Sequence, residues 1–228
     1  MPEPKPSKIS NPVGIDMGLS SFAVLSDGSE IKNPRLLRRA EEELVAAQRS
    51  LSRRKRGSRR RHEARRRLSR LHLKVRNQRG DFHAKTAATL VSRFNPIFVE
   101  ALDTRGLIEK AEQDRKGRKK FRASNKNIHD AGWGMFLQGL RGKAERAGSA
   151  TVAVEARGTS QECSGCGSLV PKTLWERTHS CGCGLVIGRD HNSARNILSR
   201  GLRLVRAGPT AREWVAEPFP KTREASPL

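Results

Sequence analysis

The segments Cys163-Ser-Gly-Cys166-Gly167 and Cys181-Gly-Cys183-Gly184 stand shortly before Arg189-Asp-His-Asn-Ser-Ala-Arg-Asn-Ile197. All four cysteines of the 228-residue chain lie in the first two segments. A Cys-x-x-Cys turn presents two thiolates from one tight bend, and structural zinc takes four ligands in tetrahedral geometry, with no position open for water. The sequence shows no pattern typical of a secretory signal, so zinc in a reducing compartment is favoured over disulfides. The two segments therefore predict a ribbon that holds a structural zinc ion.

The second cysteine pair departs from the usual spacing of a zinc ribbon. One residue separates its cysteines, and His179 can serve as the fourth ligand in place of Cys183. We prefer Cys183 because Gly184 follows it as Gly167 follows Cys166, and a glycine there suits the positive φ angle of such a turn. The alternative interpretation is four free cysteines without a metal.

The segment after the ribbon is predicted to form a helix over residues 190–205. Asp190, Ala194, Ile197 and Leu198 recur at helical spacing, which places the carboxylate on the apolar face that packs on a sheet. An ionised group on such a face is costly unless it is paired or bound to a metal. The competing interpretation is that Asp190 caps the N-terminus of the helix, a common role for Asp.

Two further carboxylates stand in predicted strands. In Val13-Gly-Ile-Asp16-Met-Gly18, alternate side chains share a face, so Asp16 lies between two glycines on a face that is otherwise bare. We expect this bare face to admit metal ions and a phosphate backbone. Glu100 ends the apolar run of residues 96–100, which predicts a buried strand reached by a helical crossover and hence parallel to a neighbour. A turn residue and an ordinary strand-end charge are the simpler interpretations of Asp16 and Glu100.

Asp16, Glu100 and Asp190 together predict an oxygen-rich site for two divalent ions. Mg²⁺ prefers such hard ligands and keeps several waters, and Mn²⁺ is suited by the same ligand types. Two ions roughly 4 Å apart activate a water and stabilise the leaving oxygen of a phosphodiester. The sequence offers no Ser/His/Asp arrangement or phosphate-binding glycine loop as a competing centre.

The chain is strongly basic, with 46 Lys and Arg against 23 Asp and Glu. Between Arg49 and Arg79 there are 15 basic residues and one Glu. Like charges this close repel unless a polyanion screens them, so we expect helices that clamp a DNA or RNA backbone rather than a merely solvated face. No apolar run approaches the roughly 18 residues of a membrane-spanning helix, which disfavours a membrane as the partner. The chain also has few aromatic side chains, which disfavours base stacking as the main binding force. The expected nucleic-acid contacts are Arg53, Arg54, Lys55, Arg56, Arg59, Arg60, Arg61, Arg65, Arg66 and Arg67.

The order of these features resembles the RuvC-like nuclease half of the transposase-accessory TnpB family, which bacterial insertion sequences encode and which is similar to the type V CRISPR effectors. The resemblance implies an α/β fold of the RNase H-like (RuvC-like) type, with a mixed sheet, long basic helices and an inserted zinc ribbon. It also implies Mg²⁺- or Mn²⁺-dependent cleavage of DNA guided by a transposon-end RNA, in the bacterial cytoplasm at the nucleoid. Asp16, Glu100 and Asp190 take the catalytic positions. The matching residues are Gly14-Ile-Asp16-Met-Gly18, Phe98-Val-Glu100, Ser160-Gln-Glu-Cys163-Ser-Gly-Cys166-Gly167 and Arg189-Asp190-His-Asn192-Ser-Ala194-Arg-Asn196-Ile197.

The expected organisation follows from this resemblance and from the local patterns. We predict a flexible leader (1–10), a RuvC-like core (11–158) with a basic helical insertion (34–94), a zinc ribbon (159–186), the last helix of the core (187–206) and a disordered tail (207–228). Within these parts, strands are predicted over 13–17, 22–25, 30–32, 96–100 and 151–154, helices over 35–90 with a break at 57–58 and over 133–144, and a mobile basic loop over 104–129.

Besides the short spacing of Cys181 and Cys183, three departures from the family pattern bear on the expected function. Glu100-Ala-Leu-Asp103 replaces the usual acidic-Leu-Asn ending, and Ser193 stands where Ala is usual. Only about ten residues precede the first predicted strand, whereas full members carry a part there that binds guide RNA and reads the target. A remnant that binds nucleic acid without cutting, or that modulates a full-length relative, is therefore the alternative function. A basic ribosomal zinc-ribbon protein would leave the three carboxylates without a role.

Overall fold

The computed structural model describes residues 9–102, 127–155, 157–173 and 175–207. Most of the predicted leader, loop and tail lie outside these residues, but residues 127–129, at the end of the predicted loop, are helical. Among the helices in the described ranges, none has the length and apolar character needed to cross a lipid bilayer.

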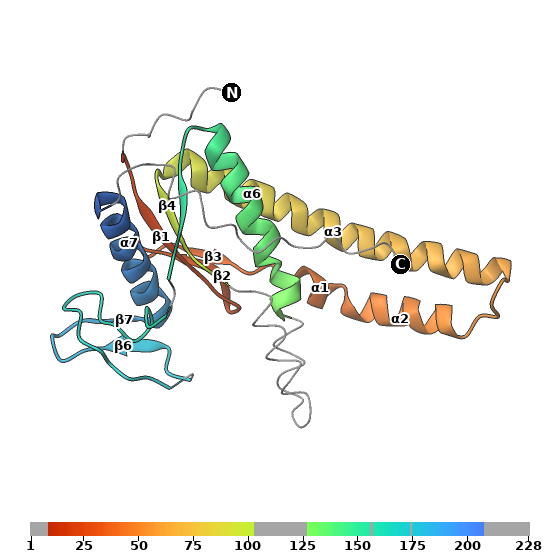
Figure 1. Cartoon of the computed structure of the whole chain (residues 1–228). Helices are drawn as coiled ribbons and strands as arrows, with labels where there is room; N and C mark the ends of the chain where they lie inside the picture. The colour runs from red at the N-terminus through yellow and green to blue at the C-terminus, as the bar shows by residue number, and fades with distance from the viewer. Residues whose placement is uncertain (1–8, 103–126, 156, 174, 208–228) are drawn as a thin grey trace. The chain divides into compact units, whose positions relative to one another are not determined.

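A five-stranded mixed sheet forms the centre of the fold (Figure 1). Its order is β3-β2-β1-β4-β5, in which β1 pairs antiparallel with β2 and β2 with β3, while β4 lies parallel to both β1 and β5. The predicted α/β fold of the RNase H-like type is confirmed, and so is the parallel pairing of the strand that ends at Glu100. The strands are β1 (Val13–Met17), β2 (Ser21–Leu25), β3 (Glu30–Lys32), β4 (Ile97–Glu100) and β5 (Thr151–Val154).

The chain divides into two compact units. One, the sheet unit, comprises Met1–Asn33 and Ala87–Leu228, and the other, the basic hairpin, comprises Pro34–Thr86. Three helices begin in the basic hairpin. A break at Ala40 lies between the first and the second, and the predicted break at 57–58 lies between the second and the third. These helices are α1 (Leu36–Arg39), α2 (Glu41–Ser52) and α3 (Arg59–Arg93), the last of which ends in the sheet unit.

Helix α7 (Arg189–Ala207) packs on one face of the sheet. Ile197 joins Phe98, Val152 and Val154 in a buried cluster. A methyl group at Gly201 would lie 2.1 Å from the Phe98 ring, so the helix backbone lies directly on β4. Helix α6 (Trp133–Arg146), which covers the helix predicted over 133–144, also packs on the sheet, where the rings of Phe136 and Phe22 meet edge-on with centroids 4.9 Å apart.

Gly14 has a different role from the one predicted. A Cβ atom there would lie 2.2 Å from the carbonyl oxygen of Ala194 and 2.5 Å from the backbone nitrogen of Leu198. The expectation of a bare face open to metal ions and phosphates is therefore wrong at Gly14, because α7 covers it. The glycine allows the helix backbone to approach β1 closely, which brings the first turn of α7 toward Asp16.

Candidate metal centres

Asp16 and Glu100 lie side by side in the sheet. The parallel register pairs Gly14 of β1 with Phe98 of β4, and two residues further along each strand come Asp16 and Glu100. Their carboxyl groups are hydrogen-bonded to each other, and Glu100 is 8% exposed. Both side chains share the face that α7 covers, as strand alternation requires.

Asp190 approaches this pair from α7. Ala194 contacts Gly14, so Asp190, one helical turn earlier, lies at the end of α7 that is nearest Asp16. Its side chain is 30% exposed, and Arg189 Nε lies 3.4 Å from its Oδ1 atom. Ala194 and Ile197 are fully buried, so the predicted sheet-facing side of this helix is confirmed.

The electrostatics of the pair follow from burial and crowding. Burial, together with the charges of Glu100 and Asp190, raises the pKa of Asp16 from 3.8 to about 9, although Arg189 opposes the shift. Burial also raises the pKa of Glu100, although hydrogen bonds from Asp16 and Thr159 work against it. In the metal-free protein the raised pKa favours the protonated form of Asp16, whose O–H can donate a hydrogen bond to the Glu100 carboxylate.

The donor set fits divalent cations with hard oxygen ligands. A cation at Asp16 and Glu100 would replace the shared proton and offset the repulsion that raises the Asp16 pKa. Among the described residues, the four cysteines form the only group of three or more His, Cys, Asp or Glu side chains that is close enough to hold one metal ion, with ligand atoms within 4.8 Å of one another.

The four cysteines form the second candidate centre. Strands β6 (Thr178–Ser180) and β7 (Val186–Gly188) make a two-stranded ribbon, and the Sγ–Sγ distances are 3.7 Å for Cys163–Cys183 and 3.6 Å for Cys166–Cys181. Tetrahedral zinc with Zn–S bonds of about 2.3 Å places its sulfurs about 3.8 Å apart. The thiols therefore have the spacing of a zinc site.

The turns of this centre have the predicted geometry. Gly167 and Gly184 have φ angles of 79° and 92°, and their N–H groups donate to the carbonyls of Cys163 and Cys181. A hydrogen bond with the Ser168 hydroxyl is the largest influence that lowers the pKa of Cys166 to about 6. A backbone hydrogen bond with Cys183 lowers the pKa of Cys181, but its neighbouring thiols raise it to about 12. A cation among the four sulfurs would favour their thiolate forms and offset the repulsion between them. His179 is fully buried and outside the thiol group, so the preference for Cys183 is supported.

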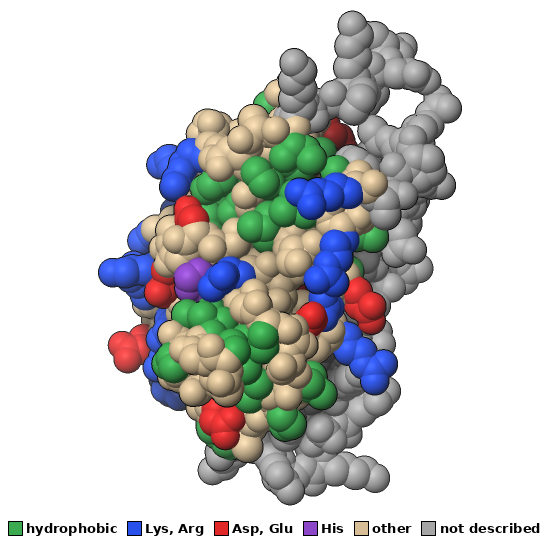
Figure 2. Space-filling view, turned by 90° about the vertical axis from the view of Figure 1, so that its left-hand side faces the viewer, with side chains coloured by type: hydrophobic (Ala, Val, Ile, Leu, Met, Phe, Trp, Pro, Cys, Tyr) green, Lys and Arg blue, Asp and Glu red, His purple; other side chains and the backbone are tan. Residues whose placement is uncertain are grey.

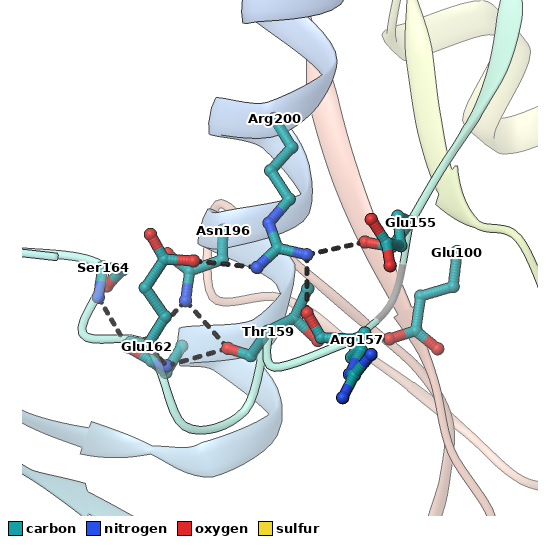
Figure 3. A network of polar contacts seen from close by, with 9 residues as sticks. Glu100, Glu155, Arg157, Thr159, Glu162, Ser164, Asn196 and Arg200 are labelled. Carbon is teal, nitrogen blue, oxygen red and sulfur yellow. Dashed lines mark hydrogen bonds and ion pairs between the residues drawn. The ribbon is translucent and has the colours of Figure 1, made fainter. Parts of the chain in front are cut away.

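A polar network that the sequence reading did not assign joins α7 to the start of the ribbon (Figure 3). Asn196 Nδ2 donates to the carbonyl oxygens of Thr159 and Glu162 at 2.8 and 2.7 Å. Arg200 donates to the carbonyls of Glu155 and Arg157 and to the Glu162 carboxylate, each at 2.8 Å. The signal was present in the sequence: Asn192, Asn196 and Arg200 recur every four residues and share one face of the helix.

An open groove of about 760 Å³ borders this network, lined by residues that include Arg200, Arg203, Leu169 and Leu204. None of the three carboxylates lines it, so this hollow is separate from the carboxylate centre. Figure 2 shows the side of the molecule where α7 and the ribbon lie, with basic, acidic and apolar side chains interspersed on it.

The basic hairpin carries the predicted nucleic-acid contacts. Nine of the ten predicted residues are exposed, and the exception is Arg61. Arg61 Nη1 donates to the carbonyl oxygens of Leu51 and Arg54, at 3.0 and 3.1 Å. Arg61 therefore closes the turn between α2 and α3, a role that the sequence analysis did not foresee.

We expect adjacent arginines of this turn to behave differently. Arg60→Ala should weaken DNA binding and reduce its salt dependence, because the substitution removes an exposed cation that is expected to contact the phosphate backbone. Arg61→Ala should destabilise the hairpin by about 1 kcal/mol, because two carbonyls lose a charged donor. Gel shifts over a salt series and thermal melts followed by circular dichroism measure the two effects. Equal melting temperatures for the two variants would contradict the assignment of Arg61.

The raised pKa of Asp16 predicts how stability depends on pH without added Mg²⁺ or Mn²⁺. Because the folded-state pKa is raised from 3.8 to about 9, the stabilising contribution is complete below 3.8 and is lost as the pH rises toward 9. Stability should therefore fall by at most about 1.4 kcal/mol per pH unit from this group. Urea unfolding of the zinc-loaded protein from pH 5.5 to 8.5 measures it. Asp16→Asn should remove this part of the slope, and parallel curves for both proteins would refute the prediction.

Together, the fold and the four-cysteine ribbon, whose geometry suits zinc, define the class of protein: an RNase H-like fold with a cysteine ribbon. The family model described as "Probable transposase" matches residues 1–111, and the one described as "Cas12f1-like, TNB domain" matches residues 133–197. A relative from Streptomyces pristinaespiralis, "Putative RNA-guided DNA endonuclease", is 36% identical over 83% of this chain and 45% of that protein. "TnpB-like protein L79" of Acanthamoeba polyphaga mimivirus is 30% identical over 64% of this chain and 27% of that protein. The predicted resemblance is thereby confirmed, and the chain belongs to the TnpB-like family.

A solved structure supports the same fold. The chain matches the protein in "Cryo-EM structure of the Cas12f1-sgRNA-target DNA complex" with a TM-score of 0.54 and 17% identity, over 88% of this chain and 52% of that chain. At this identity the match shows the fold alone. The chain spans about half the length of that protein, and less than half of the two relatives named above.

Proposed function

We propose that this chain is the nuclease half of a TnpB-like, RNA-guided DNA endonuclease that hydrolyses phosphodiester bonds with two divalent metal ions. The observation that carries the proposal is the convergence of Asp16, Glu100 and Asp190 from two parallel strands and the first turn of α7. Crowded, buried carboxyls are unfavourable for stability, so their grouping calls for a functional explanation. Two relatives of the chain bear the names of an RNA-guided DNA endonuclease and a TnpB-like protein.

Each carboxylate has a separate task in this proposal. Asp16 contacts Glu100 and is within the field of Asp190, so it would hold the metal ions together with these two residues. Glu100 and Asp190 would supply the other carboxylate ligands. Bound Mg²⁺ or Mn²⁺ would supply an activated water and stabilise the leaving oxygen. Arg189, 3.4 Å from Asp190, is placed to offset negative charge in the metal-free protein.

In this proposal the ribbon has a structural role, and the basic hairpin binds nucleic acid. The four cysteines would hold structural zinc, since four protein ligands leave no position for a reactant. The exposed arginines of the basic hairpin would bind the backbones of target DNA and guide RNA, with an affinity that falls as salt rises. The competing proposal is a nucleic-acid-binding protein that does not cleave.

Cleavage assays on the full chain separate the two proposals. The probes are fluorescently labelled single- and double-stranded DNA, each with and without an RNA transcribed from the transposon end, in Mg²⁺, in Mn²⁺ or without either ion. Cleavage that requires one of these ions supports the endonuclease. Salt-sensitive binding without cleavage in every arm would overturn it and favour the non-cleaving protein.

A further inference from the structure

Thr159, in the first turn of the ribbon segment, connects the two metal centres. It is 3% exposed, and its hydroxyl lies 3.5 Å from Glu100 Oε1, although 59 residues separate them in sequence. Figure 3 shows Thr159 between the α7 network and the Glu100 carboxylate. The separation is longer than the roughly 2.5–3.0 Å of a typical O–H···O hydrogen bond, but the contact is buried.

The backbone of Thr159 is held from the opposite side by α7. Its carbonyl oxygen accepts from Asn192 Nδ2 at 3.2 Å and from Asn196 Nδ2 at 2.8 Å. Both amides also donate to the Glu162 carbonyl, at 2.7 Å. Asn192 Oδ1 in turn accepts from the N–H of Ser164, beside the first zinc-binding cysteine. Asn192 is fully buried and Asn196 is 5% exposed. The start of the ribbon is therefore fixed to the helix that carries Asp190.

We propose that Thr159 is a positioning residue, whose hydroxyl holds the Glu100 carboxylate in the orientation that binds the catalytic metal. This inference rests on the proposed two-metal function. Helix α7 carries Asp190 itself. Through Asn192 and Asn196 it also holds Thr159, which in turn contacts Glu100. The anchored start of the ribbon would thus support the carboxylate centre through Thr159.

The chemistry of a hydroxyl suits this task. Glu100 ends its strand and has three side-chain torsions, so it needs a partner to select one arrangement. A neutral donor on one carboxylate oxygen leaves the other oxygen for the metal, and a hydroxyl keeps the negative charge that the cation needs. Such partners of metal ligands typically change metal affinity or activity by about 10–100-fold when they are removed.

Isosteric substitution tests the proposal on the full, zinc-loaded chain. Thr159→Val keeps the shape but removes the donor, and Thr159→Ser keeps the donor. Mn²⁺ titration followed by electron paramagnetic resonance of the free ion measures affinity without cleavage. We expect Thr159→Val to weaken Mn²⁺ binding about tenfold, and Thr159→Ser to stay within about threefold of the wild type. The Mn²⁺ concentration for half-maximal cleavage should shift in parallel.

Zinc content and melting temperature show whether each variant is folded. If Thr159→Val retains zinc and binds Mn²⁺ as tightly as the wild type, or if Thr159→Ser is as weak as Thr159→Val, the positioning role is wrong. Asp190→Asn separates this failure from a failure of the proposed function. If the wild type and Asp190→Asn bind Mn²⁺ equally, the carboxylates are not the metal site, and both proposals fall.

Discussion

Replacing Asp16 with Asn is expected to lower Mg²⁺-dependent DNA cleavage at least about a thousandfold, because a bound metal supplies several kcal/mol of transition-state stabilisation. Asn keeps the size of the side chain but cannot supply the negative charge that the ions would share with Glu100 and Asp190. DNA affinity at a fixed salt concentration should change little, because the expected backbone contacts lie in the basic hairpin. Single-turnover cleavage and gel shifts on the same preparation measure the two quantities.

The matched control is Glu145→Gln, which removes an exposed carboxylate that pairs with Arg141 on α6. It should leave both cleavage and binding unchanged. Retention of wild-type cleavage by Asp16→Asn would show that the carboxylate group is not the catalytic centre. A parallel loss of DNA affinity would instead show that Asp16 acts through binding.

Replacing Cys163 with Ser is expected to remove zinc and unfold the ribbon. Cys163 is 1% exposed and lies 3.7 Å from Cys183, so its loss breaks the tetrahedral set at its buried ligand. Structural zinc contributes on the order of 10 kcal/mol to the folding of small zinc modules. Zinc stoichiometry should fall from one ion per chain to near zero, and limited proteolysis should cut within residues 163–188 before it cuts within the five-stranded sheet.

Leu169→Ser is the control for this change, because it introduces the same side chain at a ribbon position that is 67% exposed. It should keep zinc and remain resistant to protease. Full zinc occupancy in Cys163→Ser would mean that another group, with His179 as the first candidate, completes the site.

Local sequence patterns were sufficient for the elements that carry the carboxylates. Val13, Ile15 and Met17 alternate with Gly14 and Asp16, and the structure has a strand over these residues. The spacing of Ala194 and Ile197 likewise predicted which side of the last helix is buried. These features depend on periods of two and 3.6 residues, which short segments express without reference to the rest of the chain.

The features that the sequence did not predict depend on contacts between distant segments. Gly14 was interpreted as an opening for metal ions, but a helix 180 residues later lies on it. Among ten similar basic residues, nothing in the local pattern distinguishes Arg61, whose role follows from the turn that folds it back onto Leu51 and Arg54. Thr159 is inconspicuous in sequence, because its role depends on Glu100 and on the asparagines of α7.

The two occupied faces of α7 have a consequence for recombination between relatives. One face packs against the sheet through Ala194 and Ile197, and another holds the ribbon backbone through Asn192, Asn196 and Arg200. If only the cysteine module were replaced by that of a relative, the backbone carbonyls of the new loop would have to accept the hydrogen bonds of Asn192, Asn196 and Arg200 in the original helix. The smallest segment that keeps these contacts together is the ribbon with its helix, residues 155–207, and hybrid proteins with a junction between ribbon and helix should be the ones that fail to fold.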